Sequence, residues 1–284
     1  MRSVSMSREK YLKSLFDTDG VGLEIGPSHN PLLPKKQGYN VEILDHLCQK
    51  SLINKYQNAT GVNLSNIEIV DYVLEEKSLY ETIQKDGYYD FIVASHVIEH
   101  TYDMIGFLND CSKLMKNSGK LVLAVPDKRF SFDVLRSLSS TGDFIQASIE
   151  KRQCHSIGNI FDELMYNSLR DEAIGWLPSD QGELTFFNSM DKAKNIFDNL
   201  IENNKSIDIH AWQFTPSSFR LIINDLHQNN FIQLSEQKFH DVQGEFYMVL
   251  EKKDSKLTIP RITLAKKIIE EQYEIHVNTE ESSL

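Results

Sequence analysis

The chain has 284 residues, of which 40% are hydrophobic and 25% are charged. Apolar and aromatic residues recur along nearly the whole length, which excludes disorder as the general state of the chain. Thirty Lys and Arg stand against 41 Asp and Glu, so the formal net charge is -11. Because a uniformly acidic surface repels phosphate backbones, we expect no non-specific binding of nucleic acid.

The longest apolar run, Leu121–Val125, is far shorter than the ~20 residues that a membrane-spanning helix needs. Met1–Lys10 contains no apolar stretch and does not resemble a secretory signal. Cys48, Cys111 and Cys154 are odd in number and far apart, which fits neither a disulfide framework nor a zinc site. We therefore expect a cytoplasmic protein without membrane insertion.

Five short apolar runs in the first half predict buried strands. Each is apolar and rich in β-branched residues nearly throughout, as is typical of parallel strands that are covered on both faces. The runs are Val21–Ile25, Asn40–Leu44, Ile67–Val73, Asp90–Ser95 and Lys120–Val125.

Helical patterns separate these runs. Apolar residues at helical spacing from Met104 to Met115 predict a helix that ends at Asn117-Ser118-Gly119. Shorter helices are predicted over Tyr11–Phe16, Leu47–Tyr56 and Leu79–Ile83. This alternation predicts the α/β class, with a doubly wound and mainly parallel sheet.

The alternation stops after Asp127, and residues 130–209 are expected to form an α-rich insertion over the carboxyl edge of the sheet. It resumes with Trp212–Phe214 and a helix over Ser217–Gln228. Two late strands, Phe231–Leu234 and Glu245–Leu250, are expected to pair antiparallel at the edge of the sheet.

Polar residues follow every predicted strand of the first half, at the edge where open α/β sheets bind ligands. They are Glu24-Ile25-Gly26-Pro27-Ser28, Asp45-His46, Asp71-Tyr72, Ser95-His96-Val97-Ile98-Glu99-His100 and Pro126-Asp127-Lys128-Arg129. Asp45 lies nineteen residues after Gly26, where an acidic side chain accepts hydrogen bonds from both hydroxyls of a ribose.

The loop after the first predicted strand argues against a bound phosphate. It has one glycine, Gly26, followed by Pro27, Pro31 and Pro34, which lack the backbone N–H groups that hold a pyrophosphate. This disfavours a nicotinamide-dependent oxidoreductase and a nucleotide-binding P-loop. A nucleoside without phosphates, such as S-adenosylmethionine with its cationic sulfonium, fits an acidic pocket better.

Four segments resemble class I S-adenosylmethionine-dependent methyltransferases: GLEIGPSHNP (22–31), VEILDH (41–46), YDFIVASHVIEH (89–100) and GKLVLAVPDKRFSFD (119–133). More narrowly, they are similar to a bacterial subgroup often encoded beside glycosyltransferases in surface-polysaccharide (capsule or O-antigen) gene clusters. The similarity continues in DIHAWQFTPSSF (208–219) and GEFYMVLEKK (244–253).

The resemblance implies a Rossmann-like sheet of seven strands in the order 3-2-1-4-5-7-6, with an antiparallel seventh strand, and S-adenosylmethionine as cofactor. The implied cofactor-binding residues are Glu24, Gly26, Pro27, Ser28, Asp45, His46, Asp71, Tyr72, Ser95 and His96, with Asp45 on the ribose, Asp71 and Tyr72 beside the adenine, and Ser95 and His96 facing the methyl group. The sequence lacks the second and third glycines of the family's first motif, which leaves the path of that loop open.

The domain organisation expected from pattern and resemblance has five parts. A helix at 1–20 precedes the cofactor-binding half at 21–129, and the insertion at 130–209 would form a substrate lid. The last helix and edge strands follow at 210–253, and a charged tail at 254–284 contains a predicted helix over Ile262–Tyr273 that offers one contact for a homodimer.

Methyl transfer releases a neutral thioether, so the protein mainly has to align the acceptor with the methyl group and exclude water. A sugar hydroxyl also needs a general base, for which His is the usual side chain. His96 is the first candidate and His210 the second, whereas His100 is interpreted as a helix cap. Candidate substrate contacts are Asp127, Lys128, Arg129 and Trp212.

No metal site is assigned from the sequence, because no spacing forces Asp133, Asp162, Glu163 and His155 to converge. The leading hypothesis is methyl transfer to an oxygen of a carbohydrate or polysaccharide precursor. A small-molecule N- or O-methyltransferase of natural-product metabolism, and a catalytically silent module of the same fold, stay open as alternatives.

Overall fold

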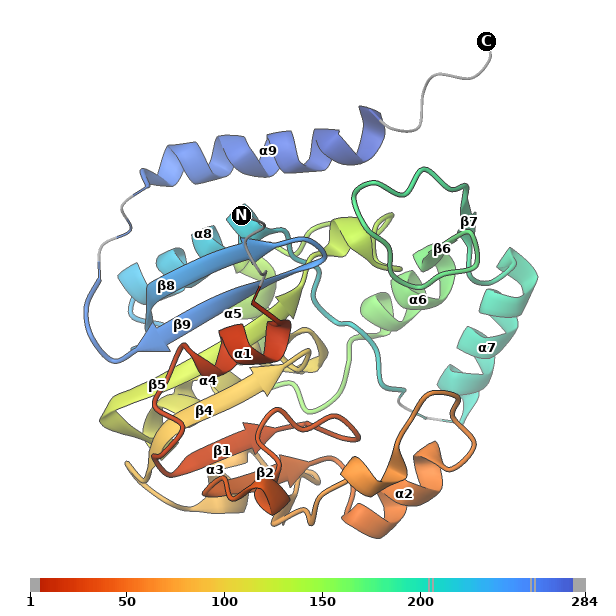
Figure 1. Cartoon of the computed structure of the whole chain (residues 1–284). Helices are drawn as coiled ribbons and strands as arrows, with labels where there is room; N and C mark the ends of the chain where they lie inside the picture. The colour runs from red at the N-terminus through yellow and green to blue at the C-terminus, as the bar shows by residue number, and fades with distance from the viewer. Residues whose placement is uncertain (1–5, 204, 206, 256, 258, 278–284) are drawn as a thin grey trace, which may run out of the picture.

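The computed structural model describes residues 6–203, 205, 207–255, 257 and 259–277. Its centre is a seven-stranded sheet in the order β3-β2-β1-β4-β5-β9-β8 (Figure 1). The strands are β1 Gly22–Ile25, β2 Val41–Asp45, β3 Tyr72–Val73, β4 Tyr89–Ser95, β5 Met115–Pro126, β8 Ser235–Val242 and β9 Glu245–Glu251. β1 to β5 pair in parallel, whereas β9 is antiparallel to both β5 and β8. The predicted fold class and strand order are thereby confirmed.

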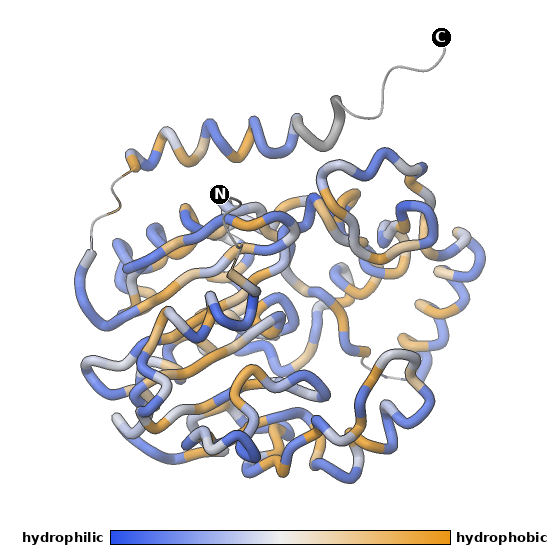
Figure 2. The backbone as a smooth tube through the Cα atoms, viewed as in Figure 1, coloured by the Kyte–Doolittle hydropathy of each residue, from blue (hydrophilic) through white to orange (hydrophobic). Residues whose placement is uncertain are grey.

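Alternate residues of the central strands face two separate apolar cores, as the pleat of a strand requires. Leu121, Leu123 and Val125 of β5 face the larger core. Val122 and Ala124 face the smaller one. Figure 2 shows long hydrophobic stretches in the central strands. The predicted burial on both faces is therefore confirmed.

Helices cover the larger core on one face of the sheet. These are α3 Leu79–Ile83, α4 Met104–Leu114, α5 Thr141–Ile149 and α8 Pro216–Gln228, each of which contributes buried apolar residues to that core. α4 begins after Asp103, whose carboxylate accepts a hydrogen bond from Gly106 N at 2.9 Å. The opposite face is covered by the short helix α1 Arg8–Lys13 and by the chain around Leu32 and Leu33.

The segment 130–209 has two structural parts. α5 packs with α4 and α8 beside the sheet. Beyond it, α6 Ile157–Tyr166 and α7 Met190–Glu202 pack on each other around a small apolar core of their own, next to the hairpin of β6 Ser168–Arg170 and β7 Leu184–Phe186. In Figure 1 this second part lies on the side toward which β1 and β4 point.

The remaining helices lie at the periphery. α2 Gln49–Tyr56 follows β2, and α9 Arg261–Val277 packs against α8, where Ser217 Oγ donates a hydrogen bond to Glu271 at 2.6 Å. Short 3₁₀ turns include η3 Ile98–His100, directly after β4. Among the described residues, no helix combines the length and the apolar character needed to cross a membrane.

Several predicted boundaries were wrong. β3 is confined to Tyr72–Val73, and Ile69 within the predicted run is 64% exposed. The last strand in the sheet order lies at Ser235–Val242 instead of Phe231–Leu234, and Trp212–Phe214 is no strand. The helix α4 ends at Leu114, before the Asn117-Ser118-Gly119 stop, because β5 already begins at Met115.

Candidate functional site

The loop after β1 passes close to the segment after β4. Gly26 has φ +64, a conformation that favours glycine, and a Cβ built on it would lie 2.9 Å from Val97 Cγ2. Ser28 is also left-handed, with φ 53. Ser28 Oγ and His29 Nδ1 are buried without a hydrogen-bond partner among the described residues. The loop after β1 therefore leaves polar groups unsatisfied at the carboxyl edge of the sheet.

Glu24 lies beneath this loop and shapes it from below. Its carboxylate is 3% exposed and accepts hydrogen bonds from Leu32 N at 2.6 Å and Leu33 N at 3.0 Å. Burial raises the pKa of Glu24 to about 7, against the opposing effect of these two N–H donors. Both oxygens of Glu24 are therefore engaged with backbone N–H groups on the buried side, where they order the loop after β1.

Asp45 joins the loops that follow β1 and β2. Asp45 Oδ2 accepts a hydrogen bond from Ser28 N at 2.9 Å, and Oδ1 accepts one from His46 N at 2.8 Å. The His46 ring adds a contact of 2.6 Å from Nδ1 to Oδ1. Asp45 is only 1% exposed, but a carboxylate offers about four acceptor positions, so these three contacts leave one position for a further hydrogen-bond donor.

The sequence predicts Asp71 and Tyr72 after the end of the third strand, but in the structure they lie before that end. Asp71 is alongside the middle of β2, where its carboxylate accepts a hydrogen bond from Ile43 N at 2.7 Å and pairs with Lys35. The Tyr72 hydroxyl lies 3.3 Å from Glu42, away from the carboxyl edge. Because β3 begins only at Tyr72, the predicted position of both residues after the strand is wrong, and the edge is formed by Val73 and Leu74.

Ser95 and His96 end β4, and two groups that sequence reasoning missed hold them. Arg8 Nη2 of α1 donates to Ser95 Oγ at 2.7 Å, and Arg8 Nε pairs with Glu245 at 2.6 Å. His96 has φ 54, and its Nε2 lies 3.0 Å from Glu245 Oε2. Although burial opposes it, the hydrogen bonds from His96 and Arg8 hold the pKa of Glu245 at about 2. The side chain of His96 is 46% exposed, so it stays open to a ligand.

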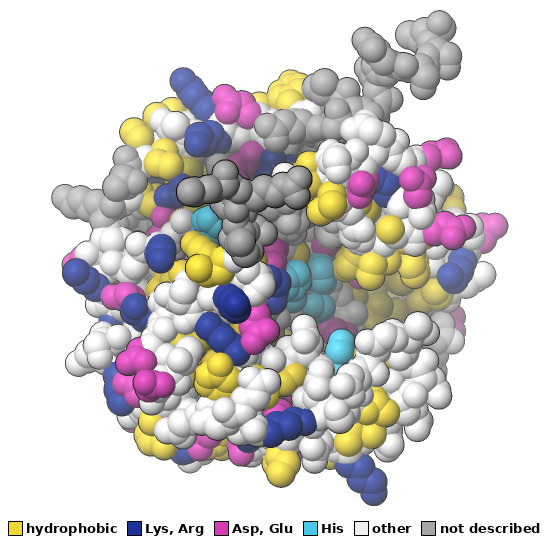
Figure 3. All heavy atoms as spheres, viewed as in Figure 1, with side chains coloured by type: hydrophobic (Ala, Val, Ile, Leu, Met, Phe, Trp, Pro, Cys, Tyr) yellow, Lys and Arg dark blue, Asp and Glu magenta, His cyan; other side chains and the backbone are white. Residues whose placement is uncertain are grey.

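A second polar cluster lies directly beside His96. Glu99, His100 and His210 each offer one ligand atom, and these atoms lie within 4.8 Å of one another. Figure 3 shows histidine side chains gathered near the centre of the face viewed in Figure 1, where the surface is hollowed. Sequence reasoning assigned His100 to capping and did not single out Glu99, although the pattern H-x-x-E-H after a strand is a signal that points to it.

His210 is held by charges from the segment after β5. Its Nδ1 lies 2.5 Å from Asp133 Oδ2, and Arg136 bonds to both Asp133 and Glu163. Burial lowers the pKa of His210, but the hydrogen bond and charge of Asp133, with Glu99 and Glu163, raise it to about 9. Because a general base has to be unprotonated at neutral pH, this environment disfavours His210 in that role.

Most of the predicted substrate contacts are buried and engaged. Asp127 is 0% exposed and pairs with Arg129 at 2.6 Å, and Lys128 Nζ donates to Val134 O at 2.7 Å. Burial lowers the pKa of Lys128 to about 8. Trp212 Nε1 donates to Thr101 O at 2.7 Å within the larger core. Asp127, Lys128 and Trp212 are therefore bonded within the protein, whereas Arg129 also lines a surface cavity with Phe130 and Asp241.

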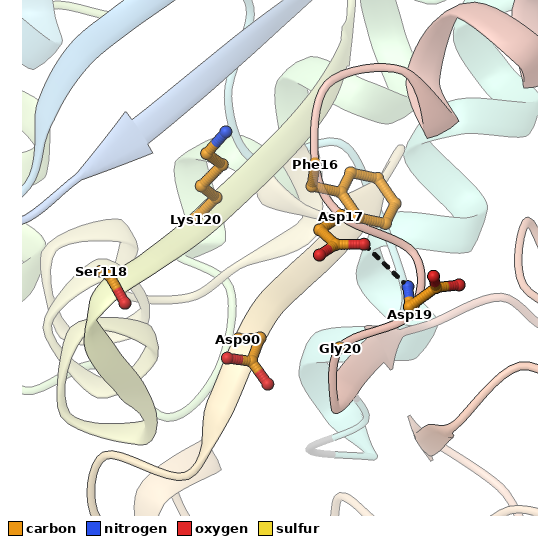
Figure 4. Close-up of a pocket in the computed structure, with 7 residues that line it drawn as sticks. All are labelled: Phe16, Asp17, Asp19, Gly20, Asp90, Ser118 and Lys120. Carbon is orange, nitrogen blue, oxygen red and sulfur yellow. Dashed lines mark hydrogen bonds between the residues drawn. The ribbon is translucent and has the colours of Figure 1, made fainter.

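A pocket at the opposite edge of the sheet is remote from these groups. Phe16, Asp17, Asp19, Gly20, Asp90, Ser118 and Lys120 line it (Figure 4). Gly20 precedes β1 and Asp90 is the second residue of β4, so the pocket of Figure 4 faces the amino ends of these strands. Ligands of this fold class bind at the other edge.

The residues at the carboxyl edge fit the predicted cofactor. Gly26 leaves room that a Cβ would fill, and Ser28 and His29 present unsatisfied polar atoms. Asp45 supplies a carboxylate at the end of β2, and His96 is partly exposed at the end of β4. Carboxylate, hydroxyl and backbone N–H groups are the partners that a ribose and a zwitterionic amino acid require.

A family model and several solved structures resemble this chain. A family model described as a methyltransferase domain matches residues 5–173, and no curated protein matches the sequence.

Similar solved structures include an S-adenosylmethionine-dependent methyltransferase from Methanosarcina mazei (13% identity, 86% of this chain, 98% of that chain, TM-score 0.44). The CcbJ methyltransferase from Streptomyces caelestis follows with 9% identity, 85% and 86% coverage and a TM-score of 0.43. A Pyrococcus horikoshii protein, PH0226, has 13% identity, 86% and 87% coverage and a TM-score of 0.42. Likenesses this distant say nothing about the acceptor.

Proposed function

This chain belongs to the class I S-adenosylmethionine-dependent methyltransferases, and from that premise we propose that its acceptor is an oxygen of a carbohydrate or of a capsule or polysaccharide precursor. The enzyme class is EC 2.1.1.-, and S-adenosylmethionine is the methyl donor. The proposal concerns the acceptor and the residues that act on it.

We assign the cofactor to the carboxyl edge between β1, β2 and β4. Gly26, Pro27 and Ser28 would face its amino-acid end, and Asp45, with His46 beside it, would accept hydrogen bonds from the ribose hydroxyls. Ser95 and His96 would lie next to the methyl group. Placing the sulfonium among carboxylates at this edge favours the cation electrostatically.

The position and exposure of His96 are the observation that supports an oxygen acceptor. An alcohol has to lose its proton as it attacks the methyl carbon, so its methylation gains from a base, whereas a neutral amine attacks through its lone pair. His96 is partly exposed at the end of β4 and is oriented by the hydrogen bond between its Nε2 and Glu245. S-adenosylmethionine would supply a methyl group whose C–S bond breaks as the C–O bond to the acceptor forms, and His96 would take the proton of the alcohol.

The carbohydrate acceptor is supported by the similarity to methyltransferases of surface-polysaccharide clusters and by the lid. α6, α7 and the β6–β7 hairpin form a separate packed unit beyond the carboxyl edge, with room for variation in acceptor contacts. Exposed Phe186 and Phe187 of this unit provide aromatic surface of the kind that packs on sugar rings. Arg129 is retained as a candidate contact for an acidic sugar or a precursor.

The test is transfer of labelled methyl groups from S-adenosylmethionine to fractionated nucleotide sugars and glycans. The proposal predicts label in a carbohydrate fraction, in a base-stable ether linkage, and its loss with His96→Gln. Label in amines or small aromatic metabolites would instead support a natural-product acceptor. No transfer to any fraction, with intact cofactor binding, would support a silent binding module.

A further inference from the structure

Glu99 is a fully buried carboxylate without a hydrogen bond. It lies in η3 and is 0% exposed, and neither Oε1 nor Oε2 has a hydrogen-bond partner among the described residues. The nearest ring nitrogen of His96 is 3.7 Å from Oε1, beyond hydrogen-bonding distance. Burying a carboxylate is costly unless a cation or hydrogen-bond donors compensate its charge. Glu99 therefore requires a positive partner at this place.

Two histidines face the same place with their Nδ1 atoms already engaged. His100 Nδ1 lies 2.9 Å from Asp208 Oδ1, and His210 Nδ1 lies 2.5 Å from Asp133 Oδ2. A carboxylate bonded to Nδ1 fixes the proton on that nitrogen and leaves the Nε2 lone pair for a metal ion. Such a carboxylate is the usual outer partner of a metal-binding histidine. The two imidazole rings lie edge to face, with centroids 4.6 Å apart.

The backbone holds the two parts of this cluster together. Ala211 N donates to Glu99 O at 2.7 Å and Trp212 N donates to the same oxygen at 3.2 Å. These bonds bring the chain around residue 210 against η3, although 110 residues separate the two segments. Trp212 Nε1 adds a bond to Thr101 O. The positions of the three side chains are therefore set by the fold and not by their mutual contacts.

We propose that Glu99, His100 and His210 bind one divalent transition-metal ion. Two imidazole nitrogens and one carboxylate favour ions such as Zn²⁺, Fe²⁺ or Mn²⁺ over Mg²⁺ and Ca²⁺, which prefer oxygen ligands. The ligand atoms lie within 4.8 Å of one another. Binding therefore requires side-chain movements that bring each atom to about 2 Å from a common centre. Three protein ligands leave positions open for water or an acceptor oxygen.

The metal site lies next to the proposed position of the methyl group, because Glu99 Oε1 is 3.7 Å from Nδ1 of His96, the residue proposed to face that group. A metal ion there would bind an acceptor hydroxyl and lower its pKa, which adds to what His96 does. This role depends on the proposed function, whereas the binding of the metal does not. A metal-binding measurement can therefore fail while cofactor binding and methyl transfer remain, and the two proposals are tested separately.

The experiment is calorimetric titration of the chelator-treated full chain with Zn²⁺, Mn²⁺ and Mg²⁺, with elemental analysis of the dialysed complex. The proposal predicts one Zn²⁺ per chain and an affinity for Mg²⁺ at least 100-fold weaker. Glu99→Gln, His100→Gln and His210→Gln each weaken Zn²⁺ binding 100-fold or more. Asp133→Asn, which touches no metal, weakens it 10- to 100-fold through His210. Co²⁺ substitution adds a visible spectrum that changes in each ligand variant.

His240→Gln is the matched control, because His240 stacks on Tyr11 and lies outside the cluster. It should leave Zn²⁺ binding unchanged. If Glu99→Gln fails to fold because Glu99 is buried, His100→Gln still tests the proposal, since the side chain of His100 is partly exposed. Substoichiometric binding, or binding that survives His100→Gln and His210→Gln, overturns the proposal. A folded wild type that binds no Zn²⁺ also overturns the proposal. In that case a proton on His210, without any metal ion, balances the charge of Glu99.

Discussion

Asp45 and Ser28 are joined by a hydrogen bond of 2.9 Å from the Ser28 backbone N–H to Asp45 Oδ2. This bond ties the loop after β1 to the end of β2, so the carboxylate proposed for the ribose also organises the loop proposed for the amino-acid end. Binding of the cofactor and order of this loop should therefore be coupled.

Gly26→Ala should weaken cofactor binding. A side chain at φ +64 costs about 1 kcal/mol, and the added Cβ at 2.9 Å from Val97 Cγ2 pushes the loops after β1 and β4 apart. We expect roughly a 10-fold rise in the Kd of S-adenosylhomocysteine, measured by calorimetry.

Gly38→Ala is the matched control for this change. Gly38 has φ +91, but nothing lies within 4 Å of a Cβ built there. The backbone strain is similar and the contact is absent, so the Kd should stay at the wild-type value. An equal loss of affinity in both variants would show that general strain, and not the approach of Gly26 to Val97, is responsible.

His96→Gln should lower kcat and spare cofactor binding. Removing a general base typically costs about 100-fold or more in rate. We expect kcat for methyl transfer to fall by that order while the Kd of S-adenosylhomocysteine changes less than about 2-fold. Glu245→Gln, which loosens the hold on His96, should show a smaller fall in kcat. A normal kcat in His96→Gln would remove this residue from the mechanism.

His155 should make the protein sensitive to acid. The side chain packs edge-on against Tyr102 and is 5% exposed, and burial lowers the pKa of His155 from 6.5 to about 4. Between these values the unfolded chain binds a proton that the folded chain does not. The stability contribution is therefore complete above pH 6.5 and is lost as the pH falls toward 4, by at most about 3 kcal/mol.

Urea unfolding of wild type and His155→Gln from pH 7.5 to 4.5 measures this effect. The free energy of unfolding of the wild type should fall more steeply with decreasing pH than that of the variant, so that the difference between them narrows. Parallel curves would mean that His155 titrates normally in the folded protein.

The sequence predicted the sheet well because buried parallel strands are apolar throughout, and it located β1, β2, β4 and β5 within a few residues. It failed on β8, since an edge strand is half exposed and SEQKFHDV has no apolar run. It also extended β3 through Ile69, because an exposed isoleucine looks like a buried one in a single sequence.

The site was predicted less completely. Residues at strand ends were identifiable from the fold class alone, as with Asp45 and His96. The burial of Asp127 and Lys128 could not be predicted, because it depends on how the chain after β5 folds back onto the sheet. The meeting of Glu99 with His210 rests on the hydrogen bond from Ala211 N to Glu99 O, which no local pattern signals.

Titration of S-adenosylhomocysteine into wild type, Asp45→Ala and Asp19→Ala tests the central claim most directly. Asp19 is exposed beside the pocket of Figure 4, at the far edge of the sheet, and serves as the control. We predict micromolar one-to-one binding to wild type and Asp19→Ala, and binding at least about 100-fold weaker to a folded Asp45→Ala, because hydrogen bonding of the ribose to a charged acceptor is lost together with the bond that holds Ser28 N. Equal affinity in all three proteins, or no binding to wild type, would contradict the assignment of the nucleoside to this edge.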